Sequence, residues 1–202
     1  MAVSLAAGAV VGLLAAGCEP NAPGVDPALR GLVQPAVRAD LAASLEKQSA
    51  GLLGTELPES KPRWFCAVRV VEARAGRRGV VEAGVVAHCE ELGRRGRGLV
   101  RGTAEAGPWV VEVERDAAGA SGASAASGAS GASGADCRRV RAKEAAPDGA
   151  GHAEWVRRAF SKAGAAEVLR QGQDGAWDGE GEVREAARKH FRLPAGVAVR
   201  DV

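Results

Sequence analysis

The stretch WFCAVRVVEARAGRRGVVEAGVVAHCE, which runs from Trp64 to Glu90, decides the fold. Its two halves are rich in valine and partly alternate apolar with polar residues, which predicts half-buried antiparallel strands over 65–74 and 80–90. Between them, Ala75–Gly79 contains two glycines, the residue type that tolerates the positive φ of tight turns. The stretch therefore predicts a β-hairpin.

The two cysteines of this hairpin specify its register. If the turn centres between Arg77 and Arg78, Cys66 lies opposite Cys89. The same rule aligns two further apolar pairs on that face, Val68 with Ala87 and Val70 with Val85. A slip of one residue would separate the cysteines. We expect a Cys66–Cys89 disulfide, worth about 3 kcal/mol in the loop-entropy account; the alternative is two free buried cysteines.

The N-terminus predicts export from the cytosol. Residues 3–17 carry no charge and are too few to span a membrane comfortably, as in a signal-peptide core. They end in LAAGC, residues 14–18, which resembles a bacterial lipobox, where the cysteine is lipidated and becomes the mature N-terminus. Ala15 stands where that motif prefers Leu, and no Lys or Arg precedes the apolar run. An ordinary cleaved signal peptide and a buried cytosolic helix are the alternatives.

These features predict the order of segments along the chain. We expect a signal peptide over 1–17, lipidation at Cys18 and a polar tether over 18–25, followed by one domain over 26–202. The expected location is the outer face of the cytoplasmic membrane, with the lipid anchor as the membrane contact and secretion as the alternative. Cys137 is then the odd cysteine, either free or paired between molecules.

The rest of the chain predicts an α+β fold. Asp26-Pro27 is a typical helix start, and apolar residues recur every four positions as far as about Gln48, with Pro35 expected to kink or divide the helix. Further strands are predicted over 99–105, 109–115 and 137–143, with turns over 93–98 and 106–108, and a last short strand around 197–199. Helices are predicted over 152–160, with a pattern that extends to Leu169, and over 182–191. This order describes an N-terminal helix packed on a curved antiparallel sheet of four or five strands, with C-terminal helices, cystatin-like or NTF2-like by analogy.

Two segments are predicted to be loops. Residues 49–63 contain two glycines and two prolines between the first helix and the hairpin. Residues 117–135 consist almost entirely of Gly, Ala and Ser in a near-triplet repeat, which cannot bury enough apolar surface to order itself. We expect this second segment to be a disordered loop, with a surface linker for a partner as the alternative.

Motifs and composition point to no reaction. The chain contains no G-x-S-x-G elbow, H-E-x-x-H pair, C-x-x-C pair or phosphate loop. We therefore predict no catalytic, cofactor-binding or metal-binding residue. His88, Cys89, Glu90 and Glu91 could suggest a metal or acid/base group, but His88 and Glu90 should point away from Cys89 in a strand. The net charge of +2 and an aromatic content of 3% argue against a nucleic-acid partner.

One set of short motifs resembles a known family. It comprises Trp64-Phe65-Cys66, Cys89-Glu90, the stretch GLVRGT at 98–103, and Trp155-Val156 with Phe160-Ser161. Together they resemble a family of uncharacterised actinobacterial lipoproteins or secreted proteins, over about residues 60–200. The resemblance implies location and domain extent but no activity.

The leading functional hypothesis is a non-enzymatic envelope lipoprotein whose domain binds a protein or small molecule outside the membrane. One alternative is a small enzyme that uses a cavity in a cone-shaped sheet, with His88 as a possible base. The other is a structural accessory subunit of an envelope complex, which would expose a large apolar patch.

Overall fold

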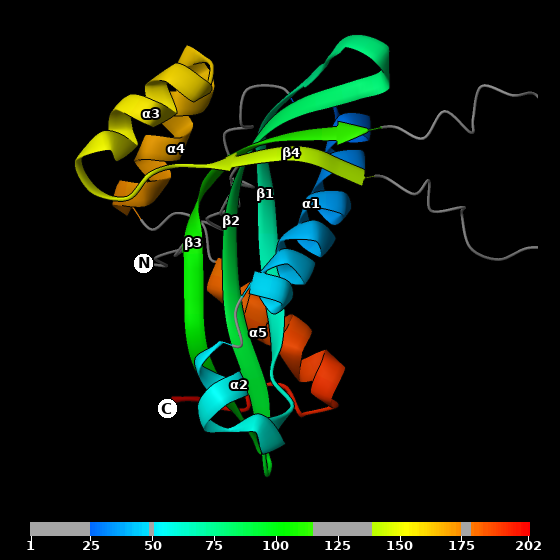
Figure 1. The fold of residues 1–202 in the computed structure, drawn as a ribbon, viewed down its shortest axis with the longest axis vertical. Helices are drawn as coiled ribbons and strands as arrows, with labels where there is room; N and C mark the ends of the chain where they lie inside the picture. Colours follow the sequence, from blue (N-terminus) through cyan, green and yellow to red (C-terminus); the bar gives the residue numbers. More distant parts are fainter. Residues whose placement is uncertain (1–24, 49–50, 115–138, 175–178) are drawn as a thin grey trace, which may run out of the picture.

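The computed structural model describes residues 25–48, 51–114, 139–174 and 179–202 (Figure 1). The predicted signal peptide, lipidated Cys18, the disordered loop over 117–135 and Cys137 all lie outside the described residues. Val25, at the end of the predicted tether, is described and is buried in the core. No helix among the described residues is long and apolar enough to cross a membrane.

The fold is α+β, built on one curved five-stranded sheet (Figure 1). Strands β1 (Arg63–Ala75), β2 (Val80–Arg95), β3 (Gly98–Glu114) and β4 (Arg139–Ala145) follow one another as antiparallel neighbours. Strand β5 (Val199–Asp201) pairs with β3 in parallel. The predicted α+β fold on a curved sheet is confirmed, and the parallel pairing of β5 makes this sheet mixed where an antiparallel one was expected.

The predicted hairpin register is confirmed. Cys66 pairs with Cys89, and the two apolar pairs predicted beyond it are also formed, Val68 with Ala87 and Val70 with Val85. The disulfide joins the first pair, whose Cα atoms are 4.1 Å apart. The side-chain alternation of the two strands was thus sufficient to locate the bridge.

A β-bulge changes the register farther along the hairpin. Val70 pairs with Val85 but Glu72 pairs with Gly84, so Val71 is an extra residue. Because of the bulge, the side chains of Val71 and Glu72 both lie on the face that carries the C-terminal helices. Val71 packs with Trp155 there, and Glu72 accepts hydrogen bonds from Ser161. The turn is a short 3₁₀ segment over Arg77–Gly79, closed by Gly79 at φ 77°.

Strand β3 is one long strand where two were predicted. The expected turn over 106–108 is absent, because Ala106, Gly107 and Pro108 stay paired with β2. The Pro108 carbonyl accepts a hydrogen bond from the Ala146 N–H at 3.0 Å, on the side away from β2. Both backbone groups of a strand residue point the same way, so the N–H that proline lacks would not have bonded to β2.

The other predicted turn, over 93–98, is shorter than expected. Strand β2 continues to Arg95, and β3 starts at Gly98, so that only Gly96 and Arg97 form the turn. Gly96 has φ 60°, the conformation in which glycine is favoured. The result is a long β2–β3 ribbon that ends at one tip of the molecule (Figure 1).

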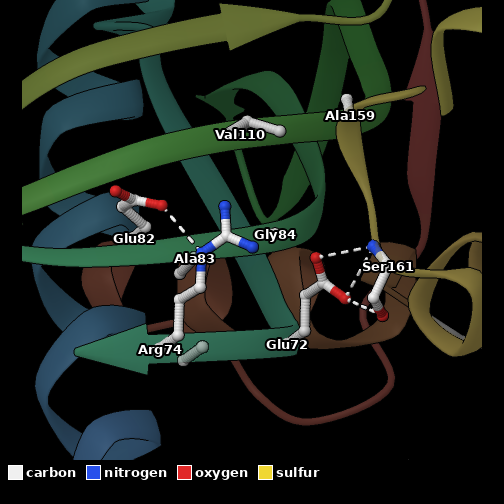
Figure 2. Close-up of a pocket in the computed structure, with 9 residues that line it drawn as sticks. Glu72, Arg74, Glu82, Ala83, Gly84, Val110, Ala159 and Ser161 are labelled. Carbon is white, nitrogen blue, oxygen red and sulfur yellow. Dashed lines mark hydrogen bonds and ion pairs between the residues drawn. The ribbon is translucent and has the colours of Figure 1, made fainter. Parts of the chain in front are cut away.

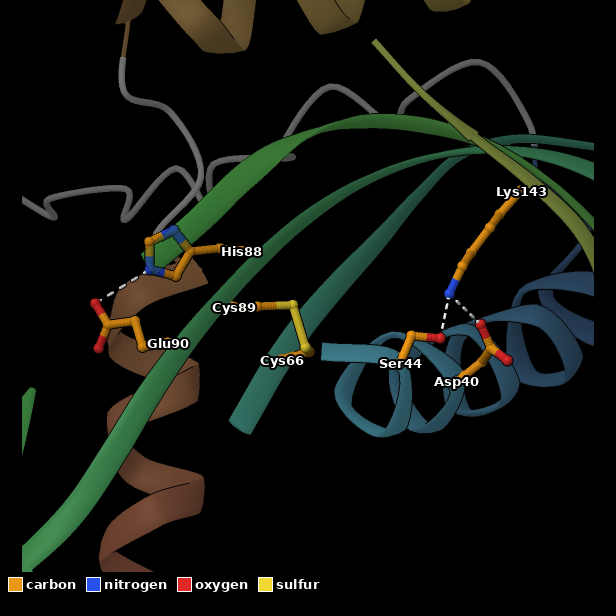
Figure 3. The surroundings of a disulfide bond; sticks show 7 residues. All are labelled: Asp40, Ser44, Cys66, His88, Cys89, Glu90 and Lys143. Carbon is orange, nitrogen blue, oxygen red and sulfur yellow. Dashed lines mark hydrogen bonds and ion pairs between the residues drawn. A yellow bond between two sulfur atoms is a disulfide. The ribbon is translucent and has the colours of Figure 1, made fainter. Parts of the chain in front are cut away.

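Helix α1 (Pro27–Gln48) covers one face of the sheet. Asp26 caps it by accepting a hydrogen bond from the Ala28 N–H, and the helix continues undivided through Pro35. Its buried side chains share one cluster with the disulfide and with inward residues of β1, β2 and β3. The helix residues of this cluster are Leu32, Val33, Val37 and Leu41. Hydrogen bonds also join β4 to α1, because Nζ of Lys143 donates to Oδ2 of Asp40 at 2.8 Å and to Oγ of Ser44 at 2.5 Å (Figure 3).

The C-terminal helices cover the opposite face. They are α3 (His152–Ala159), α4 (Lys162–Asp174) and α5 (Gly179–Phe191). The predicted continuous pattern from 152 to Leu169 is broken at Phe160, whose extended backbone lets its ring pack on Trp155 in the cluster under α3 and α4. A separate cluster joins α5 to β1, β2 and β3. The predicted loop over 49–63 contains one short helix, α2 (Leu52–Glu56), and a 3₁₀ turn over Pro58–Ser60.

Candidate functional site: a buried glutamate beneath helix α5

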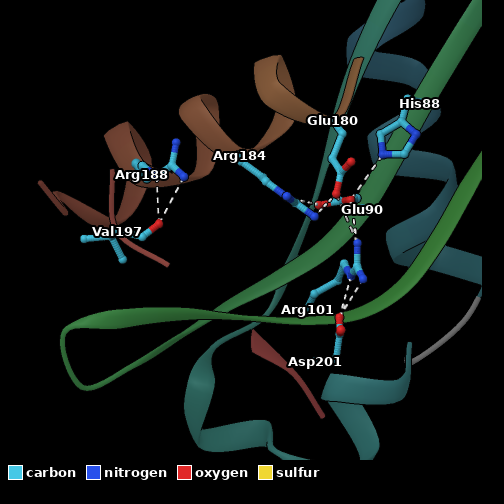
Figure 4. Close-up of polar contacts among 8 residues, drawn as sticks. All are labelled: His88, Glu90, Arg101, Glu180, Arg184, Arg188, Val197 and Asp201. Atoms are coloured by element: carbon cyan, nitrogen blue, oxygen red, sulfur yellow. Dashed lines mark hydrogen bonds and ion pairs between the residues drawn. The ribbon is translucent and has the colours of Figure 1, made fainter. Parts of the chain in front are cut away.

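The charged cluster around Glu90 is the candidate site, because its central carboxylate is fully buried. The side chain of Glu90 is 0% exposed. One oxygen lies 3.2 Å from Nε2 of His88 and 3.5 Å from Nη1 of Arg101, and the other lies 3.5 Å from Nε of Arg184 (Figure 4). An ionised buried carboxylate requires such partners.

Three elements bring these residues together. On β2, the two-residue period places His88 and Glu90 on the face opposite Cys89 (Figure 3). On β3, Arg101 pairs with Leu92, a residue of the cluster under α5. Helix α5 supplies Arg184. The site therefore forms only where α5 packs across the β2–β3 ribbon.

A second set of acids surrounds the arginines. Arg101 bridges Glu90, Glu180 of α5 at 3.2 Å and Asp201 of β5 at 2.7 Å. Arg184 is also paired with Glu180, four residues before it on the same helix. Arg101 thus connects β2, β3, β5 and α5 through one guanidinium group.

The electrostatics favour a charged Glu90. Burial by itself raises its pKa, but the hydrogen bond from His88 and the charges of Arg184, His88 and Arg101 outweigh burial and hold the pKa below its ordinary value. The hydrogen bond to Asp201 raises the pKa of Arg101. Oε2 of Glu90 and Nε of Arg184 are buried without a hydrogen bond among the described residues, and they face each other as a close ion pair only.

The cluster could in principle support proton transfer. His88 is 21% exposed and contacts a carboxylate, which is the pairing that orients a histidine base. The acidic partner, however, has no exposed surface and a lowered pKa, so it is a poor proton donor near neutral pH. The arrangement suits electrostatic stabilisation of the fold better than turnover.

The four residues 88–91 do not form one site. Cys89 lies on the α1 face, within the disulfide (Figure 3), and Glu91 also points away from Glu90, toward α2. Among the described residues, no three His, Cys, Asp or Glu side chains are grouped so as to hold a metal ion. The cluster that does form joins His88 and Glu90 to basic residues distant in sequence.

Glu91, which the sequence analysis grouped with His88 and Glu90, is a second buried acid with a separate set of contacts. It accepts hydrogen bonds from the backbone N–H groups of Leu53 and Gly54, both at 3.0 Å, and of Thr103 at 3.4 Å. Gly51 and Gly102 make room for it, since a Cβ at either position would lie within 2.4 Å of the carboxylate group. The carboxylate therefore holds α2 against the sheet.

Glu72 performs a similar task for α4. Its carboxylate accepts hydrogen bonds from the N–H of Ser161 and, at 2.5 Å, from its hydroxyl (Figure 2). A hollow of about 220 Å³ lies beside this contact, between the β1–β2 hairpin and Ala159. The lining carboxylates Glu72 and Glu82 are already bonded to Ser161 and Arg74, so this hollow offers a ligand few free polar groups.

The sequence reasoning missed Arg184, Glu180 and Asp201. The usable signal was Glu90-Glu91 inside a strand of otherwise apolar residues, which requires buried partners somewhere in the fold. Arg101 was not identified either, although it lies within β3 and is ion-paired. No family model, no curated protein and no solved structure matches this chain.

Proposed function

We propose that the chain is a lipid-anchored envelope protein whose folded domain binds a protein or small molecule outside the membrane without catalysing a reaction. The observation that carries the proposal is the bridge between Cys66 and Cys89, both more than 90% buried in the core. Protein disulfides persist mainly in oxidising compartments. The lipobox-like Cys18 supplies the anchor, and the resemblance to uncharacterised actinobacterial lipoproteins points to the same location.

The contacts of three acids, the buried Glu90 and Glu91 and the half-buried Glu72, support a binding role over an enzymatic one. Glu90, Glu91 and Glu72 each contact groups that join separate elements of the fold, namely α5, α2 and α4. A catalytic acid or base must instead reach a substrate. Their function here is architectural.

A small enzyme with His88 as its base is the second candidate. It is favoured by the 3.2 Å contact between His88 and Glu90 and by the partial exposure of the imidazole. His88 lines neither the hollow beside Glu72 nor the one described below. The accessory-subunit alternative is weakened, because the large apolar side chains exposed in the described part of the chain are only Leu52 and Val202.

Intact mass of the protein from the membrane fraction of its native host tests the proposal. We expect a mass that begins at Cys18 and includes acyl chains, with two further thiols that react with alkylating reagent only after reduction. Cys18→Ser should remove the acyl mass, whereas Cys137→Ser, the matched control, should keep both the acyl chains and the protected thiols. A full-length cytosolic chain with freely reactive thiols would overturn the proposal.

A further inference from the structure

A basic hollow of about 730 Å³ lies at the tip of the molecule that carries the β2–β3 turn. Three arginines line it: Arg95 at the end of β2, Arg97 in the turn and Arg200 of β5. The exposed apolar residues Ala198 and Val202 also line the hollow, together with the half-buried Val197. It therefore combines three guanidinium groups with an apolar surface.

These three arginines differ from those of the Glu90 cluster. Arg95, Arg97 and Arg200 are exposed, and no carboxylate of the described residues lies within ion-pair distance of them. The acid that does line the hollow, Asp201, is held by Arg101 at 2.7 Å. The hollow thus presents uncompensated positive charge, whereas Arg101 and Arg184 are neutralised by acids around them.

The walls of the hollow are held in place before any ligand arrives. The Leu99 N–H donates to the Ala198 carbonyl at 3.3 Å, and Leu99 and Arg101 pair in register with Val199 and Asp201. The Arg101–Asp201 ion pair adds a side-chain link between the same strands. A binding site with fixed walls loses less conformational freedom when a ligand binds.

We propose that this hollow binds a phosphate-bearing group. Guanidinium groups offer paired N–H donors that match phosphate oxygens, and the apolar side chains suit the carbon portion of a phosphate ester. The inference deepens the proposed function and rests on it only for the side of the membrane on which the ligand is met. A phospholipid headgroup beside the anchor and a soluble phosphate compound share this chemistry.

The test compares two triple variants of the full-length chain. The first, Arg95→Gln, Arg97→Gln and Arg200→Gln, removes the charge of the hollow. The control, Arg157→Gln, Arg158→Gln and Lys162→Gln, removes the same charge from exposed positions on α3 and α4, at the opposite end of the molecule (Figure 1). The probes are inorganic pyrophosphate, followed by amide NMR shifts, and phosphatidylcholine vesicles with or without phosphatidylglycerol, followed by co-flotation.

The proposal with a lipid source is supported if vesicle binding increases with phosphatidylglycerol and the hollow variant binds about a hundredfold more weakly. That factor is expected because each of the three basic residues near an anionic surface contributes about fivefold to the affinity. Pyrophosphate shifts at Gly96 and Gly98 without that increase support a soluble source. Equal losses in both triple variants, or no response to either probe, would overturn the inference. Because the pyrophosphate test needs no anchor, a failed anchor and a failed phosphate site give different results.

Discussion

Glu90 and Glu91 are neighbours in the sequence, are both almost completely buried, and are stabilised in two different ways. Glu90 lies beneath α5 among His88, Arg101 and Arg184. Glu91 lies on the other face and accepts backbone N–H groups from α2 and β3. One carboxylate is balanced by full charges from distant side chains, the other by amide dipoles of nearby backbone. A buried acid in a strand therefore does not by itself indicate an active site.

The largest expected effect comes from removing the first carboxylate. Glu90→Ala leaves Arg101 and Arg184 without their buried partner, and we expect the free energy of unfolding to fall by about 3 kcal/mol, at the lower end for broken buried pairs because both arginines are partly exposed. Urea unfolding measures the change. Glu180→Gln, a change to a half-exposed partner of the same arginines, should lower it by less than about 1 kcal/mol. Equal losses in the two variants would contradict the central role of Glu90.

Removing the charge of the second carboxylate, Glu91, should destabilise the fold less than removing Glu90, but still measurably. Glu91→Gln keeps the shape and replaces one acceptor by an NH₂ group that faces the N–H donors of Leu53, Gly54 or Thr103. We expect a loss of about 2 kcal/mol in urea unfolding, because a buried donor is then unsatisfied. Hydrogen exchange should locate the faster-opening amides at Leu53 and Gly54. An unchanged exchange rate there would show that α2 does not depend on this carboxylate.

The space around Glu91 can be tested without altering any charge. A Cβ at Gly102 would lie 2.4 Å from Oε2 of Glu91 and 2.8 Å from Cγ of Leu53, so Gly102→Ala should cost about 1 to 2 kcal/mol of stability. Gly107→Ala is the matched control on the same strand, since nothing lies within 4 Å of its added Cβ, and its effect should stay within about 0.5 kcal/mol. Urea unfolding should give the Gly102→Ala variant the lower free energy of unfolding of the two. The reverse order would falsify the crowding around Glu91.

The smallest effect is a difference in pH dependence. Glu90 has a pKa held below its ordinary value of 4.5, so its ionised form adds stability at higher pH, and that contribution is lost as pH falls below 4.5 through the folded-state pKa. Unfolding free energies of the wild type and Glu90→Gln, measured from pH 6 downwards, should therefore converge on acidification. Parallel curves would show that Glu90 has the same pKa in the folded and unfolded chain.

Local patterns were enough to predict the hairpin, its register and its bridge. The alternation of Cys66, Val68 and Val70 against their partners has only one arrangement that buries all of them on one face. The prediction of two strands in place of β3 was wrong because Gly107-Pro108 was interpreted as a turn. In the structure Pro108 stays in the strand, and its carbonyl accepts a hydrogen bond from Ala146, which follows directly after β4. To predict this, one would have to know where β4 lies. Sequence alone does not carry that information.

The candidate site was harder to predict, because its members meet only through tertiary structure. His88 and Glu90 share a face by simple alternation, and this was predicted. Arg184 and Asp201 come from a helix and a strand about a hundred residues later, and neither has a sequence motif. The acids within β2 indicated that buried partners were needed, but did not identify them.

The pairing of β5 with β3 has a consequence for how the chain folds. The ion pairs that Arg101 makes with β2, α5 and β5 are complete only after Asp201, 100 residues farther along the chain, has reached its place in the sheet. Contacts of such long sequence separation form slowly, because a large loop has to close first. Until then the start of β3 is an unpaired strand edge, which is prone to association with other chains. A chain emerging from a ribosome or a translocation pore would therefore complete this part of the sheet last, and we expect newly made protein to depend most on chaperones during that interval.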